Sequence, residues 1–160
     1  MLYAICDGIY GKVHLRLAQA RLAVVEQQAR GVHRMSRQTI RAPGVPVSPL
    51  PFSPAVLAGG FVFVSGQASV DETGKIVPDT FEGEMRRSFE NVAKVLAGAG
   101  LELDDVVQVR AYVRDPGDLP VYNKVYQDLF REPYPARTTL THCLPETLRF
   151  EVEAIAQMRE

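Results

Sequence analysis

The chain has 160 residues, of which 46% are hydrophobic and 23% are charged, and its formal net charge is −1. This length holds one ordinary domain, and the balanced charge argues against recognition of nucleic acid or an anionic membrane through an overall field. No apolar run is long enough to cross a bilayer.

The first 34 residues differ from the rest in charge, because they contain five basic residues and only two acidic ones. Residues 12–30 lack proline, and their apolar residues recur at helical spacing, which predicts a helix. We interpret residues 1–34 as a basic helical extension and residues 35–160 as the domain. The alternatives are a transit peptide and a natural start at Met35.

Proline and glycine divide the next part of the chain. Five prolines in residues 42–54 predict an extended arm, because proline fits neither a helix interior nor a central strand. Residues 55–57 and 61–64 are apolar runs around a glycine turn, which predicts a hairpin. The second run should end at residues 65–67, where Gly66 lets a backbone or a ligand come close.

The next elements are a turn and a long helix. Residues 71–75 predict the turn of a further short hairpin, which would add a third strand. Asp79 and Glu82 have the spacing of a capping box, and Gly98 or Gly100 should end the helix. The expected buried stripe consists of Met85, Phe89, Val92 and Leu96.

A strand and a second helix should follow. The strand's expected apolar face consists of Val107, Val109, Ala111 and Val113, and its polar face of Gln108, Arg110, Tyr112 and Arg114. Asp118 can cap the helix, whose apolar ridge should be Tyr122, Tyr126 and Leu129. Asn123 lies on the same side and is either a core amide bonded to backbone or a site residue.

Two strands close the chain. The prolines in residues 133–135 favour extended backbone, so a strand should open at Arg137 and run to residue 143. Residues 148–156 alternate polar and apolar side chains, which predicts a half-buried strand. We expect the two strands to form a hairpin across residues 144–147.

The hairpin would gather charged side chains on one face. With Thr139 opposite Glu151 and Arg137 opposite Glu153, these four residues would form one polar patch. The core side would carry Leu140, Phe150, Val152 and Ala154. The patch is either an ordinary cross-strand ion pair or a site for a small anion.

The order of elements predicts an α+β fold, a mixed sheet with two helices on one face. The other face should display Arg110, Arg137, Thr139, Glu151 and Glu153. Covering such a face with further copies argues for an oligomer with sites at subunit boundaries.

Cysteine and histidine do not suggest a metal site. They are Cys6, Cys143, His14, His33 and His142. Their spacing matches neither a zinc site nor a disulfide framework, so we expect no metal and a reducing, cytoplasmic setting.

Five motifs resemble one known family, the Rid (reactive intermediate deaminase, YjgF-like) proteins. They are Phe63-Val-Ser-Gly-Gln67, Ser88-Phe-Glu-Asn-Val92, Tyr122-Asn123, Pro135-Ala-Arg137 and Phe150-Glu-Val-Glu-Ala-Ile-Ala156. The resemblance covers residues 36–158 and implies a chorismate-mutase-like protomer in a homotrimeric barrel. It also implies hydrolysis of enamines and imines, such as 2-aminoacrylate, to 2-oxo acids and ammonium in clefts between subunits, without a cofactor.

The resemblance implies roles for individual residues. Arg137 would hold the substrate carboxylate, and Glu151 would position or activate water. Backbone groups near Gly66 and Thr139 would orient the substrate, and Asn123 and Ser65 would line the cleft.

The chain departs from the family at two positions. Phe52 stands where a tyrosine is frequent, and Thr139 where a cysteine is; Cys143 does not replace that cysteine. The phenylalanine, together with the run of residues 57–65, resembles the subgroup of pyrimidine breakdown that acts on 3-aminoacrylate. The competing hypotheses are a non-catalytic binder of 2-oxo acids and a ribonuclease, which the near-neutral charge disfavours.

Overall fold

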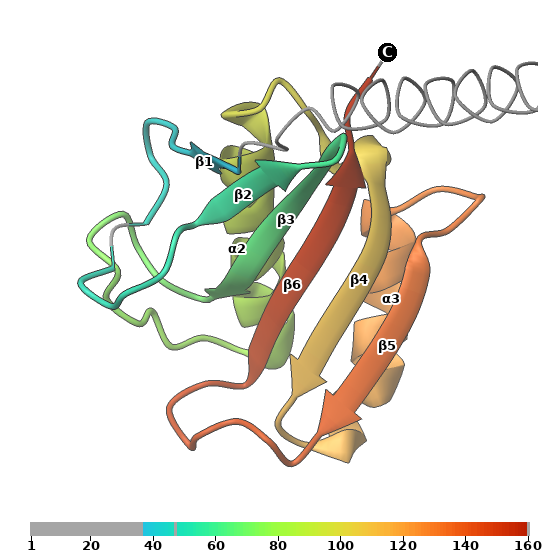
Figure 1. Cartoon of the computed structure of the whole chain (residues 1–160). Coiled ribbons are helices and arrows are strands. Elements are labelled where there is room, and N and C mark those ends of the chain that lie inside the picture. Colours follow the sequence, from blue (N-terminus) through green and yellow to red (C-terminus); the bar gives the residue numbers. More distant parts are fainter. Residues whose placement is uncertain (1–36, 47, 160) are drawn as a thin grey trace, which may run out of the picture. The chain divides into compact units, whose positions relative to one another are not determined.

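The computed structural model describes residues 37–46 and 48–159. They form an α+β fold in which one six-stranded sheet carries two long helices, both behind the sheet in Figure 1. This confirms the predicted fold class. Within these residues no helix is long and apolar enough to cross a membrane. The helix expected within residues 1–34 lies outside the described residues.

The sheet has the order β1-β2-β3-β6-β4-β5. Its strands are β1 Gln38–Ile40, β2 Ala55–Ala58, β3 Phe61–Ala68, β4 Val106–Val113, β5 Ala136–Thr141 and β6 Phe150–Gln157. The long helices are α2 Phe81–Ala97 and α3 Leu119–Leu129, and two short 3₁₀ turns are η1 Leu103–Asp105 and η2 Pro116–Asp118. All neighbouring strands are antiparallel except β4 and β5, so the sheet is mixed, as predicted.

Helix α2 supplies much of the core. The predicted stripe of Met85, Phe89, Val92 and Leu96 is buried, and the helix ends before Gly98 as expected. The predicted cap is wrong by one residue. Thr80 caps the helix and accepts a hydrogen bond from the Gly83 amide at 3.1 Å. Asp79 instead accepts from the Thr80 amide and pairs with Arg87 at 3.1 Å.

Strand β3 is longer than predicted. The hairpin from β2 turns at Gly59 and Gly60, both at positive φ, which confirms the glycine turn. The strand then continues past Ser65 to Ala68, because a bulge at residues 65–66 absorbs the irregularity without ending the pairing with β6. The expected third strand is reduced to one isolated bridge between Val70 and Ile76.

The predicted hairpin of the last two strands is wrong. Strand β5 pairs in parallel with β4, and β6 lies between β4 and β3. The physical reason is the helix before β5. A strand, a helix and a returning strand form a crossover unit whose strands are parallel, so β4, α3 and β5 form such a unit. Residues 142–149 therefore span the width of β4 instead of closing a tight turn.

This change of partner divides the predicted polar patch. Arg137 and Thr139 lie opposite the buried residues Val109 and Ala111, so they are on the helix-covered side. The open face carries Glu151, opposite Tyr112, and Glu153, opposite Arg110. The expectation that all four side chains share a face is therefore wrong.

Two apolar assignments change for similar reasons. Leu140, expected in the core, is 39% exposed, since it lies opposite Tyr112 on the open face. Val107 is 38% exposed because a register shift between Val106 and Gln108 puts Val106 into the core instead. The core residues predicted for β6, namely Phe150, Val152 and Ala154, are buried.

Candidate functional site

Arg137 lies on a platform of two aromatic rings. Its guanidinium carbon is 4.8 Å from the ring centroids of both Tyr122 and Tyr126, which are one turn apart on α3. The two centroids are only 5.8 Å from each other. Both ring centroids therefore lie to the same side of the guanidinium carbon.

Asn123 holds one edge of the same guanidinium. Its side-chain oxygen accepts a hydrogen bond from an Arg137 terminal nitrogen at 3.0 Å. Asn123 is exposed, so its interpretation as a core amide is wrong. Among the residues that the structure describes, no carboxylate lies within ion-pair distance of Arg137. The rest of the planar fork is thus open to an anionic group.

The platform is electrically neutral near pH 7. Burial raises the pKa of the Tyr122 phenol and raises that of Tyr126 to about 12. Thr139 donates a long hydrogen bond of 3.4 Å to the Tyr122 hydroxyl. The Tyr126 hydroxyl is buried and has no hydrogen-bond partner among the described residues. Arg137 therefore meets the faces of two neutral rings.

Glu151 is the centre of a second group, on the open face of the sheet. Its side chain is half-buried, and this burial, followed by the charge of Glu153, raises the pKa of its carboxyl group. A Cβ atom at Gly66 would overlap the Glu151 carboxylate oxygen. Only glycine at this position of the bulge leaves room for the carboxylate against β3.

The arm borders the Glu151 group. The Ser65 hydroxyl donates to the Ser53 carbonyl at 2.8 Å, and so holds the arm to β3. Phe52 is exposed beside a hollow of about 190 Å³ that Gly66 also lines. The predicted site residues thus form two groups: Arg137, Asn123 and Thr139 beside α3, and Glu151, Gly66, Ser65 and Phe52 around the bulge and the arm.

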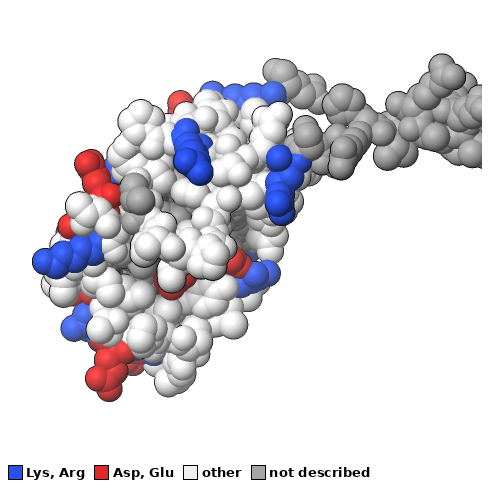
Figure 2. All heavy atoms as spheres, turned by 60° about the vertical axis from the view of Figure 1, so that its left-hand side comes forward, with Lys and Arg blue, Asp and Glu red and all other residues white. Residues whose placement is uncertain are grey.

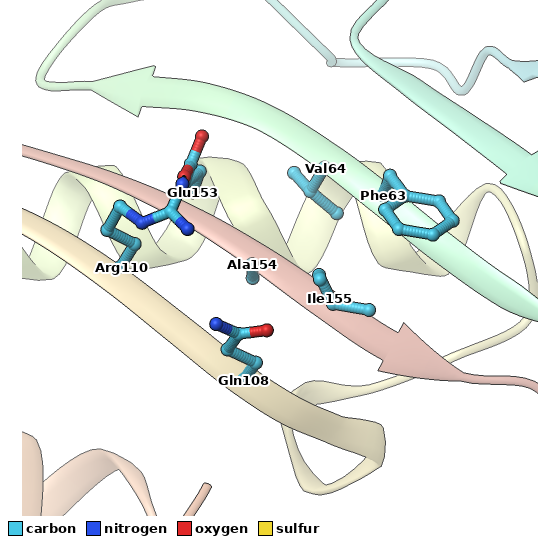
Figure 3. A pocket seen from close by; sticks show the side chains of 7 residues that line it. All are labelled: Phe63, Val64, Gln108, Arg110, Glu153, Ala154 and Ile155. Carbon is cyan, nitrogen blue, oxygen red and sulfur yellow. The ribbon is translucent and has the colours of Figure 1, made fainter. Parts of the chain in front are cut away.

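The open sheet face combines apolar side chains with an ion pair. Arg110 pairs with Glu153 across β4 and β6, which is the cross-strand pair that the sequence suggested for Arg137. Both line a hollow of about 220 Å³ together with Phe63 and Ile155 (Figure 3). Phe63 is 45% exposed, so this face has the character of an unfilled contact surface.

On the arm side of the domain, charged side chains do not form a stripe. Figure 2, which brings the arm side of the domain forward, shows a largely uncharged surface with basic and acidic side chains scattered over it. Within the described ranges, no three His, Cys, Asp or Glu residues are grouped so that they could hold a metal ion.

Comparisons with known proteins agree on one family. The model described as Endoribonuclease L-PSP matches residues 39–158. A RutC family protein of Pyrococcus abyssi is 38% identical over 124 residues, which are 76% of this chain and 98% of that protein. A 2-iminobutanoate/2-iminopropanoate deaminase of Dermatophagoides farinae is 33% identical over 121 residues, 74% of this chain and 94% of the relative.

The fold is similar to solved structures as well. The crystal structure of E. coli TdcF with bound serine superposes with a TM-score of 0.68 at 32% sequence identity. The superposition covers 76% of this chain and 99% of that protein.

Proposed function

Since the chain belongs to the Rid (YjgF-like) family, we propose that it is a deaminase that hydrolyses small 2-imino acids and their enamine tautomers. The products are 2-oxo acids and ammonium. The observation that carries this proposal is Arg137, whose guanidinium is held by two aromatic rings and by Asn123 and meets no carboxylate among the described residues. The deaminase name of relatives such as that of Dermatophagoides farinae supports the choice of reaction.

The complete site is composite. Arg137 and Glu151 are on opposite faces of the sheet, with β4 between their strands, so within one chain they cannot grip the same small molecule. Copies arranged around a symmetry axis bring the Arg137 group of one copy to the Glu151 group of the next. A homotrimer of this kind also covers the exposed Phe61 and Phe63 of the open face.

The reaction requires one water molecule and proton transfers. Arg137 binds the substrate carboxylate through two parallel hydrogen bonds, which fixes the imine carbon. Glu151 of a second copy accepts a proton from water as the water oxygen bonds to that carbon. The carboxyl group returns this proton to nitrogen, which gives a tetrahedral intermediate with one hydroxyl and one amino group. Glu151 then passes the hydroxyl proton to the amino nitrogen, the C–N bond breaks as the C=O bond forms, and ammonia leaves.

Other residues of the two groups shape the cleft. Backbone groups near Gly66 and Thr139 orient the substrate, and Asn123 holds Arg137. Phe52 offers an aromatic surface without a hydroxyl, so it contributes contact area rather than a hydrogen bond. Ser65 acts through the arm, because its hydroxyl is bonded to Ser53.

Mixing two inactive variants tests the composite site. Arg137→Ala and Glu151→Gln should each be inactive alone, and co-refolding them at equal amounts should restore activity. In random trimers about one quarter of the sites combine an intact Arg137 with an intact Glu151, so about one quarter of wild-type activity should return. Imine hydrolysis is measured after co-refolding, and mixing without refolding is the control. Recovery of no activity would show that both groups serve the same chain.

Gly66→Ala should lower kcat while the protein stays folded. The added methyl group meets the end of a flexible side chain, so Glu151 moves and the strand does not. A misplaced catalytic group costs about tenfold to 100-fold in rate. Steady-state kinetics and thermal unfolding are compared with wild type. An unchanged kcat would remove Glu151 from the reaction or show that its carboxylate tolerates displacement.

A non-catalytic binder of small carboxylates is the second candidate. The similar TdcF structure contains serine, which is not an imine. Arg137 would serve a binder equally well, whereas Glu151 would have no chemical task. Binding of 2-oxobutanoate without any acceleration of imine hydrolysis would favour this candidate.

A ribonuclease, the activity in the description of the family model, receives less support. The net charge is −1, and the face shown in Figure 2 carries charges of both signs without a basic stripe. Binding of single-stranded RNA by the protein, with an affinity that falls strongly as salt increases, would support the ribonuclease instead.

A further inference from the structure

We infer that Tyr122 and Tyr126 are positioning residues, which hold the Arg137 guanidinium so that its free edge faces the substrate carboxylate. The inference rests on the proposed function, because it assigns a task to two residues that do not themselves react. The sequence indicated only an apolar ridge at these positions.

All the groups that hold Arg137 come from one helix. Tyr122, Asn123 and Tyr126 belong to α3, whereas Arg137 belongs to β5, the strand at the edge of the sheet. The guanidinium carbon lies over both rings, and Asn123 accepts a hydrogen bond from one terminal nitrogen. A planar group that lies over two rings and donates a hydrogen bond to a third side chain has a restricted orientation. Its other N–H groups remain to bind a carboxylate.

The platform matters because Arg137 is exposed. A free arginine side chain samples many rotamers, and binding must restrict them, which weakens affinity. The ring contacts restrict them before the substrate arrives. Both rings are buried in the core and therefore rigid, as Tyr122 also packs against Phe150 with 5.9 Å between the ring centroids.

The interaction depends on the ring and not on the phenol. The Tyr126 hydroxyl has no partner among the described residues, and the phenols stay neutral. Cation–π attraction comes from the face of the ring, which phenylalanine also provides. Leucine at either position fills part of the space but offers no such face.

The test follows the Arg137 Nε–H signal by ¹⁵N NMR in the full chain while 2-oxobutanoate is added. In wild type the signal should be shifted upfield by the rings and should move with the ligand. Tyr122→Leu and Tyr126→Leu should each lose part of the upfield shift, because the other ring remains, and each should raise Kd about three- to tenfold. Tyr126→Phe should recover most of the affinity that Tyr126→Leu loses.

Tyr134→Leu is the matched control. The Tyr134 ring is exposed and lies 6.4 Å from the Tyr126 ring, centroid to centroid, but it is not over the Arg137 guanidinium. Its loss should leave both the signal and Kd unchanged. Circular dichroism establishes that each variant is folded.

Several results would overturn the inference. They are an unshifted Arg137 signal in wild type, an unchanged Kd in the folded leucine variants, or an equal loss in Tyr134→Leu. The wild-type spectrum decides the matter even if the leucine variants do not fold. Ligand binding with the expected losses but no imine hydrolysis would instead overturn the proposed function and leave the platform supported.

Discussion

Arg137→Ala should lose at least about 100-fold in kcat/KM for 2-imino acids, because two charge-assisted hydrogen bonds to the substrate carboxylate disappear. The fold should remain intact, since the side chain is exposed and makes its described polar contact only with Asn123. The measurement is hydrolysis of an imine generated in situ by an amino acid oxidase. The oligomeric state is checked alongside.

Two further variants sharpen this experiment. Arg137→Lys keeps the charge but not the planar fork, so it should recover only part of the activity. Arg131→Ala removes another exposed arginine, beyond the end of α3, and should behave as wild type. Rates for Arg137→Ala close to wild type would refute the proposed deaminase.

Glu151→Gln should lower kcat about 100- to 10,000-fold while 2-oxobutanoate still binds. Glutamine keeps the size of the side chain but cannot take the proton from water. Burial and the neighbouring Glu153 raise the pKa of the Glu151 carboxyl. Because the deprotonated form is the base, wild-type activity should fall as pH decreases through a value above that of an ordinary glutamate. Rates are measured across pH, and binding is measured separately.

Glu153→Gln is the control, two residues along the same strand. It removes the charge that contributes to the raised pKa of Glu151, so the acid limb of the rate profile should move to lower pH. Turnover should persist. A Glu151→Gln variant that turns over normally would leave the chain with binding as its only supported task.

Local patterns in the sequence were sufficient for the elements that depend on nearby residues. The stripe of α2 and the hairpin around Gly59 and Gly60 follow from spacing and from glycine conformation. The partner of β5 did not follow, because strand pairing depends on contacts between residues far apart in the chain. Recognising β4, α3 and β5 as a crossover unit would have predicted the parallel pairing.

The face of each site residue could not be predicted once the partner of β5 was wrong. Side chains alternate along a strand, so a different neighbour with a different register moved Arg137 and Glu151 to opposite faces. The sequence also could not predict the proposed role of the Tyr122 and Tyr126 rings. An aromatic ridge on a helix has the same residue spacing whether it contacts a cation or only the core. The chemical roles proposed for Arg137 and Glu151 follow from the family resemblance and not from the pattern of the strands.

The opposite orientation of Arg137 and Glu151 has a kinetic consequence under the proposed composite site. A single polypeptide, however stable, cannot form a complete active site. The rate of imine hydrolysis per chain must therefore vary with protein concentration. Upon dilution below the dissociation constant of the assembly, activity should vanish by mass action, although every chain remains folded.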